Sequence, residues 1–358
     1  MELQRHLSSR TATSTHRLSD ARLSCFRIVK ASTSQRRVKR LRCSAERIPD
    51  EYTLPDVAEF LPLLEKKRQE GRVDGPGCVY LVGTGPGDPG LLTLRAVHLM
   101  QSADVVLYDR LVSDDIMRMV HDEARMIYVG KNRSFHTRTQ TEIHQLMMQF
   151  AERGALVLRL KGGDPYIFGR GGEELLYLQE RGIPVRCIPG ITAASGISAE
   201  LGVPLTHRGV ATTVRFLTGH SREGGEEDLD ETIAKSVDPM ATLVVYMGLH
   251  TLPSLVKRLV RGGQSVKTPA VAIERGTTID QRMVYGCLDE LAESVKQAEL
   301  VSPTLIIIGD VVGLSPGWKR YQGSGCALQE GSVDSFLPKG IDFMGTSWGE
   351  NLSKEKSL

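Results

Sequence analysis

Three segments of the chain combine glycines with charged or polar residues directly after an apolar run, and each could bring backbone atoms against a ligand. The first, Gly83-Thr-Gly-Pro-Gly-Asp-Pro-Gly90, follows the apolar run 79–82. Glycine carries no side chain, so main-chain groups can approach a bound molecule closely. Asp88 and Pro89 are typical of a helix N-cap and of the first helical position, which predicts a strand, a glycine loop and a helix in that order.

By its letters this loop also fits the GxGxxG pattern of a dinucleotide site, and Asp109, at the end of the next predicted strand, suits the acid of such a site. However, Pro86 and Pro89 lack the N–H donors that a pyrophosphate-binding loop needs. An NAD-dependent or non-enzymatic Rossmann protein is therefore an alternative that these prolines disfavour. A plain strand–turn–helix corner is the other alternative.

The second segment runs from Arg159 to Glu174 (RLKGGDPYIFGRGGEE) and holds five glycines within the eleven residues 162–172. A glycine turn with a solvated charged face would explain its composition, but this density of glycine favours close approach of the backbone to a ligand. The third segment, Pro189–Gly196 (PGITAASG), follows a further predicted strand and opens a helix of small residues. On its own it would indicate only tight packing of a helix on a sheet.

Taken together and in this order, the three segments resemble the tetrapyrrole methylase family. Five shorter runs narrow the resemblance to the uroporphyrinogen-III C-methyltransferases of that family: Tyr108–Val112, Thr206–Gly209, Thr218–His220, Tyr246–Gly248 and Glu274–Thr277. The resemblance spans residues 78 to 313. It implies transfer of methyl groups from S-adenosyl-L-methionine to C2 and C7 of uroporphyrinogen III, which gives precorrin-2 for siroheme and leaves S-adenosyl-L-homocysteine. It also implies a homodimer.

The expected fold is α/β, with two αβα domains and a cofactor cleft between them, as in the tetrapyrrole methylase fold. From residue 78 to residue 188, β-branched runs alternate with helical stretches, which predicts a mostly parallel sheet covered by helices. The second half repeats this pattern less regularly. The expected division of the chain is a transit peptide (1–45), an arm (46–77), an N-terminal domain (78–208), a C-terminal domain (209–315) and a disordered tail (316–358).

The resemblance also assigns roles to single residues. It places the cofactor against Pro86, Gly162, Gly163, Asp164, Ile167, Thr192, Ala193, Met247 and Gly276. The proton acceptor and proton donor of the family fall on Asp109 and Lys131, which would otherwise be interpreted as a surface partner of Arg110 and a solvated lysine. Because uroporphyrinogen is a polycarboxylate, cations are expected to bind it: Arg110, Arg159, Lys161, Arg170, His207 and Arg208.

The distribution of charge argues against a nucleic-acid substrate. Residues 1–45 hold 11 Lys/Arg and 2 Asp/Glu, so the remainder holds 34 basic (45 − 11) and 41 acidic (43 − 2) residues. A body with a net charge of −7 is a poor electrostatic partner for RNA or DNA. This disfavours a second alternative, a methylase of the same fold that acts on ribosomal RNA or on a diphthine precursor. No apolar run approaches the ~20 residues of a membrane helix, so no membrane span is expected.

The basic segment 1–45 is rich in Ser and Thr and has no compact apolar stretch, a composition typical of an organelle transit peptide. The composition favours a plastid only slightly over a mitochondrion, so we expect the plastid stroma and the plant plastid type of the family. An anion-binding disordered tail is the other alternative. The six cysteines form no CxxC pair and no Cys/His cluster with zinc spacing. They are expected to be free thiols, and no metal site is expected.

Overall fold

The structure is a computed structural model that describes residues 76–130, 138–219, 237–325 and 327–330, with the single positions Pro62, Lys66 and Ile233. These residues belong to one compact unit, Thr53–Leu358. The predicted transit peptide, nearly all of the arm and the chain after Glu330 lie outside the described residues.

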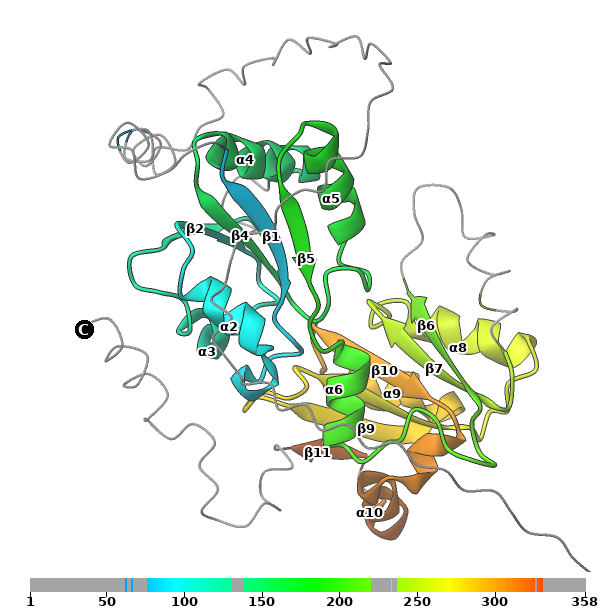
Figure 1. The fold of residues 1–358 in the computed structure, drawn as a ribbon. Coiled ribbons are helices and arrows are strands. Elements are labelled where there is room, and N and C mark those ends of the chain that lie inside the picture. Colours follow the sequence, from blue (N-terminus) through cyan, green and yellow to red (C-terminus); the bar gives the residue numbers. More distant parts are fainter. Residues whose placement is uncertain are drawn as a thin grey trace, which may run out of the picture. The chain divides into compact units, whose positions relative to one another are not determined.

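The first half is built on a parallel sheet with the strand order β3-β2-β4-β1-β5 (Figure 1). Its strands are β1 (Cys78–Gly83), β2 (Val105–Tyr108), β3 (Arg125–Tyr128), β4 (Leu156–Lys161) and β5 (Val185–Ile188). The elements between and after them are η2 (Pro89–Leu91), α2 (Leu94–Met100), α3 (Asp114–Met117), α4 (Gln140–Glu152), α5 (Gly171–Glu180) and α6 (Ala193–Glu200). The predicted parallel sheet is confirmed.

Apolar residues on alternate positions of the strands place helices on both faces of this sheet. Val79 and Leu81 are buried with Phe150 of α4 and Leu178 of α5. Val82, the next residue of β1, faces the opposite side and packs with α2 and α3. Side chains of a strand alternate between faces, so one central strand serves both cores.

Local sequence signals set the helix starts as expected. Asp88 caps η2 by accepting a hydrogen bond from the backbone N–H of Gly90, and Pro89 is its first residue. Thr139 and Glu142 form a reciprocal capping box at the start of α4. These contacts satisfy backbone donors that have no partner within the helix.

The second half contains a mixed sheet with the order β11-β9-β8-β10-β7-β6. Its elements are β6 (Thr213–Thr218), β7 (Ala241–Tyr246), α8 (Leu252–Arg261), β8 (Pro269–Glu274), β9 (Arg282–Cys287), α9 (Leu288–Gln297), β10 (Thr304–Ile308), η3 (Asp310–Leu314), α10 (Pro316–Ser324) and β11 (Leu328–Glu330). Among the described strands of this sheet, β6 and β7 are the one parallel pair, and the other pairs are antiparallel. The parallel arrangement of the first sheet is therefore not repeated. Residues 275–281 alone join β8 to β9, a connection too short for a parallel crossover.

Helix α6 packs against the second sheet. Ala194, Ile197 and Leu201 are buried with residues of β7, β8 and β10, and Figure 1 shows α6 beside β10. The predicted boundary at residue 208 therefore cuts through one apolar core. By its packing, α6 belongs with the second sheet although it follows the first in the chain.

The prediction of a disordered tail from residue 316 is wrong for the described residues 316–325 and 327–330. Trp318 of α10 is buried in the core of the second half, where it also contacts the ring of Tyr321. Strand β11 extends the sheet by antiparallel pairing with β9. A large apolar side chain and a free sheet edge order this segment in spite of its glycine- and serine-rich composition. Among the described residues, none of the helices combines the length and the hydropathy needed to span a bilayer.

Candidate functional site

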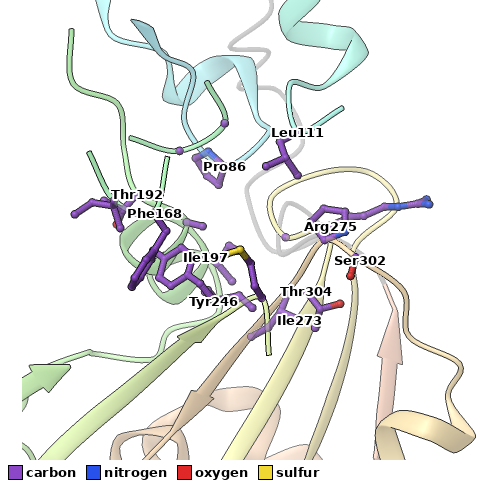
Figure 2. Close-up of a pocket in the computed structure, with 18 of the residues that line it drawn as sticks. Pro86, Leu111, Phe168, Thr192, Ile197, Tyr246, Ile273, Arg275, Ser302 and Thr304 are labelled. Carbon is purple, nitrogen blue, oxygen red and sulfur yellow. The ribbon is translucent and has the colours of Figure 1, made fainter. Parts of the chain in front are cut away.

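A cavity of about 410 Å³ lies between the two halves (Figure 2). Its walls come from the loops after β1, β2 and β4, from the start of α6, and from the facing ends of β7, β8 and β10. The parallel strands of the first sheet present their carboxyl ends to it, which is where open α/β sheets bind ligands. All nine positions predicted to bind the cofactor line this cavity: Pro86, Gly162, Gly163, Asp164, Ile167, Thr192, Ala193, Met247 and Gly276.

Asp164 is held in place by the loops on both sides of it. Its Oδ1 accepts a hydrogen bond from the Tyr166 N–H at 2.8 Å, and its Oδ2 accepts one from the Gly190 N–H at 3.1 Å. Asp164 is the acid among the residues that line the cavity. Its remaining lone pairs can therefore accept hydrogen bonds from an ammonium or hydroxyl group of a ligand.

The start of α6 is joined to the second sheet by a tyrosine. Thr192 caps the helix by accepting from the Ser195 N–H, and the Ala194 N–H donates to the Tyr246 hydroxyl at 3.0 Å. Burial raises the pKa of Tyr246, so the phenol stays neutral. This contact fixes the α6 wall of the cavity against β7.

Three non-glycine residues of the wall have a left-handed backbone, with φ of 54° for Phe168, 54° for Met247 and 46° for Arg275. Such conformations cost free energy and persist where the surrounding structure enforces them, often at ligand sites. They re-aim the backbone in three separate loops. Figure 2 shows the Arg275 side chain directed away from the neighbouring labelled residues, so Arg275 contributes chiefly its backbone.

An aromatic pair that the sequence did not single out forms part of the same wall. The rings of Phe168 and Tyr246 lie 5.0 Å apart, centre to centre, and Figure 2 shows them side by side. Both residues lie inside motifs recognised in the sequence, but nothing in a single motif indicates that they meet. Leu111, His250 and the run 302–305 were likewise missed, the last because it is the unremarkable start of an apolar strand.

Asp109 follows the last residue of β2, next to the cavity-lining residues Arg110 and Leu111. Its Oδ1 accepts a hydrogen bond from the Leu111 N–H at 3.0 Å. Its Oδ2 accepts one from Nη2 of Arg159 at 2.8 Å, so its ionic partner is Arg159 rather than its chain neighbour Arg110. The side chain of Asp109 is 22% exposed. The second predicted catalytic residue, Lys131, lies outside the described residues.

The structure separates the predicted substrate-binding cations into two groups. Arg159 and Lys161 are buried, at 4% and 5% exposure, and both contact Glu174. Neither presents its charge to the cavity, so their prediction as substrate contacts is wrong in this geometry. Arg110 lines the cavity, Arg170 pairs with Glu173 in solvent, and His207 and Arg208 are exposed on the turn before β6.

In the part of the chain that the structure describes, no group of three or more His, Cys, Asp or Glu residues is arranged to hold a metal ion. The described cysteines Cys78, Cys187 and Cys287 are free thiols.

Comparisons with known proteins identify the family of this chain. The family model of the tetrapyrrole (corrin/porphyrin) methylases matches residues 78–292. An Arabidopsis thaliana protein named S-adenosyl-L-methionine-dependent uroporphyrinogen III methyltransferase, chloroplastic, is 61% identical over 280 residues, covering 77% of this chain and 76% of the relative. A siroheme synthase of Pseudomonas putida is 51% identical over 267 residues, 75% of this chain but 57% of the relative, so this chain spans a little over half of that protein.

Among solved structures, a uroporphyrin-III C-methyl transferase of Thermus thermophilus, in complex with S-adenosyl homocysteine, is 40% identical, with a TM-score of 0.56. The match covers 66% of this chain and 94% of that chain. The native form of the same Thermus enzyme matches equally well, at 41% identity and a TM-score of 0.56. The predicted tetrapyrrole methylase fold is confirmed.

Proposed function

Because this chain belongs to the tetrapyrrole (corrin/porphyrin) methylase family, we propose that it methylates uroporphyrinogen III at C2 and C7, with S-adenosyl-L-methionine as the methyl donor. The product is precorrin-2, on the route to siroheme. The strongest support for this proposal is a single observation. The nine positions predicted to bind the donor, which come from five separate stretches of sequence, meet in one cavity.

The residues present fit an adenosyl ligand. A cavity of about 410 Å³ is within the usual size for a small-molecule site, and its wall combines apolar side chains with few polar groups. Gly162 and Gly163 expose backbone at the turn after β4, and Asp164 offers carboxylate lone pairs. Thr192 and Ala193 form the α6 side, and Met247 adds a polarisable apolar contact.

The reaction needs alignment and one base. The donor supplies an electrophilic methyl group bound to a sulfonium; in each transfer that S–C bond breaks, a bond from the methyl group to a pyrrole carbon forms, and S-adenosyl-L-homocysteine leaves. The cavity residues hold the reactants in line. The methylated ring is then cationic and must lose one proton, which the Asp109 carboxylate accepts. Lys131 serves as the proton donor of the family scheme.

The exposed members of the predicted cation set bind the carboxylates of the substrate. Arg110 lies on the cavity wall, and Arg170, His207 and Arg208 are exposed at the surface of the same unit. Guanidinium groups form paired hydrogen bonds with carboxylates, which suits a polycarboxylate ring.

The test is mass spectrometry of uroporphyrinogen III after incubation with the protein and S-adenosyl-L-methionine, under reducing and oxygen-free conditions. The expected product carries two added methyl groups. Recovery of unmodified substrate, together with methylation of ribosomal RNA offered in parallel, would favour the alternative methylase. A titration with NADH serves as the negative control for a Rossmann site.

Residues 1–45 direct the chain into plastids, and the enzyme acts there as a homodimer in the stroma. The support is the basic, Ser/Thr-rich composition and the chloroplastic Arabidopsis relative. A fluorescent fusion of residues 1–45 should accumulate in the plastid stroma; a cytosolic signal contradicts the targeting. Light scattering of the purified protein measures the dimer.

A further inference from the structure

A network of charged side chains connects the candidate base, Asp109, to the interior of the first half. Arg159 of β4 lies between two carboxylates: Nη2 donates to Asp109 at 2.8 Å, and Nε lies 3.4 Å from Oε1 of Glu174. Nζ of Lys161 contacts the same Glu174 oxygen at 3.1 Å. Arg159 and Lys161 therefore balance the charges of Asp109 and Glu174.

The guanidinium of Arg159 has little freedom to turn. Besides its two carboxylate contacts, its Nη1 donates to the Leu160 carbonyl at 2.9 Å. The side chain of Arg159 is 5% exposed and that of Glu174 is 0% exposed, so water does not compete with these contacts. The guanidinium of Arg159 is planar, so contacts to several of its nitrogens fix its orientation and that of its N–H donors.

This arrangement constrains the carboxylate of Asp109, the residue directly before the cavity-lining Arg110 and Leu111. One oxygen of Asp109 is held by Arg159 and the other by the Leu111 N–H, which leaves the carboxylate one orientation at the end of β2. We propose that Arg159 is a positioning residue for the methylation reaction: it acts through Asp109 by holding that carboxylate where it accepts the proton. The inference rests on the proposed function, in which Asp109 is the base.

The competing explanation is that Arg159 only neutralises Glu174. Two features make the explanations separable. Lys161 also contacts Glu174, so a change at Arg159 does not leave that carboxylate without a cation. Moreover, Arg159→Lys keeps a positive charge at the position but loses the planar fork that reaches Asp109 and Glu174 together.

The experiment is a double-mutant cycle on the full chain with Asp109→Asn, Arg159→Lys and the combined variant. The readouts are the methyl-transfer rate at saturating substrates, the Kd for S-adenosyl-L-homocysteine and the thermal midpoint. Asp109→Asn should lower turnover by about two to four orders of magnitude, the usual range for a general base. Arg159→Lys should lower turnover about tenfold or more in the wild-type background and less than about twofold in the Asp109→Asn background, because it acts through that carboxylate. The Kd should stay unchanged.

An equal loss in both backgrounds, or wild-type turnover for Arg159→Lys, overturns the proposal. Arg215→Lys is the matched control, because Arg215 pairs with Asp238 on the second sheet, at 3.3 Å, and should keep normal turnover. If Arg159→Lys does not fold, Arg159→Gln combined with Glu174→Gln removes one charge of each sign and enters the same cycle with the same expected results.

Failure of the inference is distinguishable from failure of the proposed function. If the wild-type protein does not methylate uroporphyrinogen III, the proposed function is wrong. If it does so and Asp109→Asn retains full turnover, the base is misassigned and the role of Arg159 is overturned with it. If the protein is active and Asp109→Asn impairs it, but Arg159→Lys lowers turnover equally in both backgrounds, Asp109 remains the base and Arg159 is structural.

Discussion

Gly85 and Gly163, which both line the cavity, exchange a pair of backbone hydrogen bonds. The Gly85 N–H donates to the Gly163 carbonyl at 3.2 Å, and the Gly163 N–H donates to the Gly85 carbonyl at 2.7 Å. Both residues have left-handed φ values, 74° and 69°. The pair joins the loop after β1 to the turn after β4, so the two glycine segments recognised in the sequence form one continuous piece of wall.

A side chain at Gly163 should weaken binding of the adenosyl ligand without unfolding the protein. A Cβ there would come no closer than 3.6 Å to Ala193 N, so the protein itself has room for it. The left-handed φ makes Gly163→Ala cost about 1–2 kcal/mol of stability. Calorimetry with S-adenosyl-L-homocysteine should show a large rise in Kd.

Gly182→Ala is the matched control for this prediction. Gly182 has a φ of 73°, and a Cβ there meets no atom within 4 Å. It lies on the turn between α5 and β5, and is not among the residues that line the cavity. Its stability loss should match that of Gly163→Ala while its Kd stays at the wild-type value. Equal Kd values for both variants would show that the turn at Gly163 does not touch the ligand.

The neighbours Glu173 and Glu174 should differ sharply in their effect on stability. Glu174 is fully buried against two cations, so Glu174→Ala leaves buried positive charge uncompensated and should cost about 3–5 kcal/mol. Glu173 pairs with Arg170 in solvent, and Glu173→Ala should cost less than about 1 kcal/mol. Urea unfolding of the three proteins measures both values. Similar losses of stability for the two variants would mean that Glu174 does not balance the buried charges of Arg159 and Lys161.

Stability should fall with acidification in a way that depends on His144. Burial lowers the pKa of His144 below 6.5, although Glu174 and Glu173 act in the opposite direction. The folded state then binds fewer protons than the unfolded state, so the stabilisation is complete above pH 6.5 and is lost as the pH falls through the lower folded pKa. His144→Gln should flatten this part of the profile. Unfolding at pH 8, where both states hold a neutral ring, isolates the packing cost of the substitution.

Trp318 should be essential for the stability of the second half. The side chain is 6% exposed and packs in the core with Tyr285, so Trp318→Ala should cost about 3–5 kcal/mol. Lys319→Ala, one residue further along α10 and exposed, should change stability by less than about 0.5 kcal/mol. Chemical denaturation of both variants checks the difference. A wild-type midpoint for Trp318→Ala would restore the expectation of a disordered tail.

Sequence patterns of short range predicted the first sheet and the glycine segments that could approach a ligand. The alternation of β-branched runs with helical stretches depends on neighbouring residues, and the glycine segments combine within themselves the features that bring backbone close to a ligand. All nine cofactor positions were assigned by the family resemblance, and Met247 and Gly276 among them lie on the second half. Their presence in the cavity wall depends on the packing of α6 against the second sheet.

The misassigned cations show why local pattern was insufficient. Arg159 and Lys161 are two residues apart on one strand, so the sequence places both on one face of the sheet. It does not say that Glu174, on the following helix, returns to that face and buries them. The sequence shows an Arg or a Lys in the same way whether its side chain is exposed or buried in an ion pair. Which of the two applies depends on a contact between separate elements.

The sequence by itself determined the glycine turns, the helix caps and the alternation of strands and helices in the first half, because each depends on backbone conformations and side-chain periods within a few residues. Tertiary structure alone decided that Asp109 faces Arg159 instead of Arg110, that Trp318 is a core residue, and that the second sheet is mixed. These features depend on contacts between segments that are far apart in the sequence. The free energy of burying a side chain depends on the residues that pack against it, and a local pattern does not contain them.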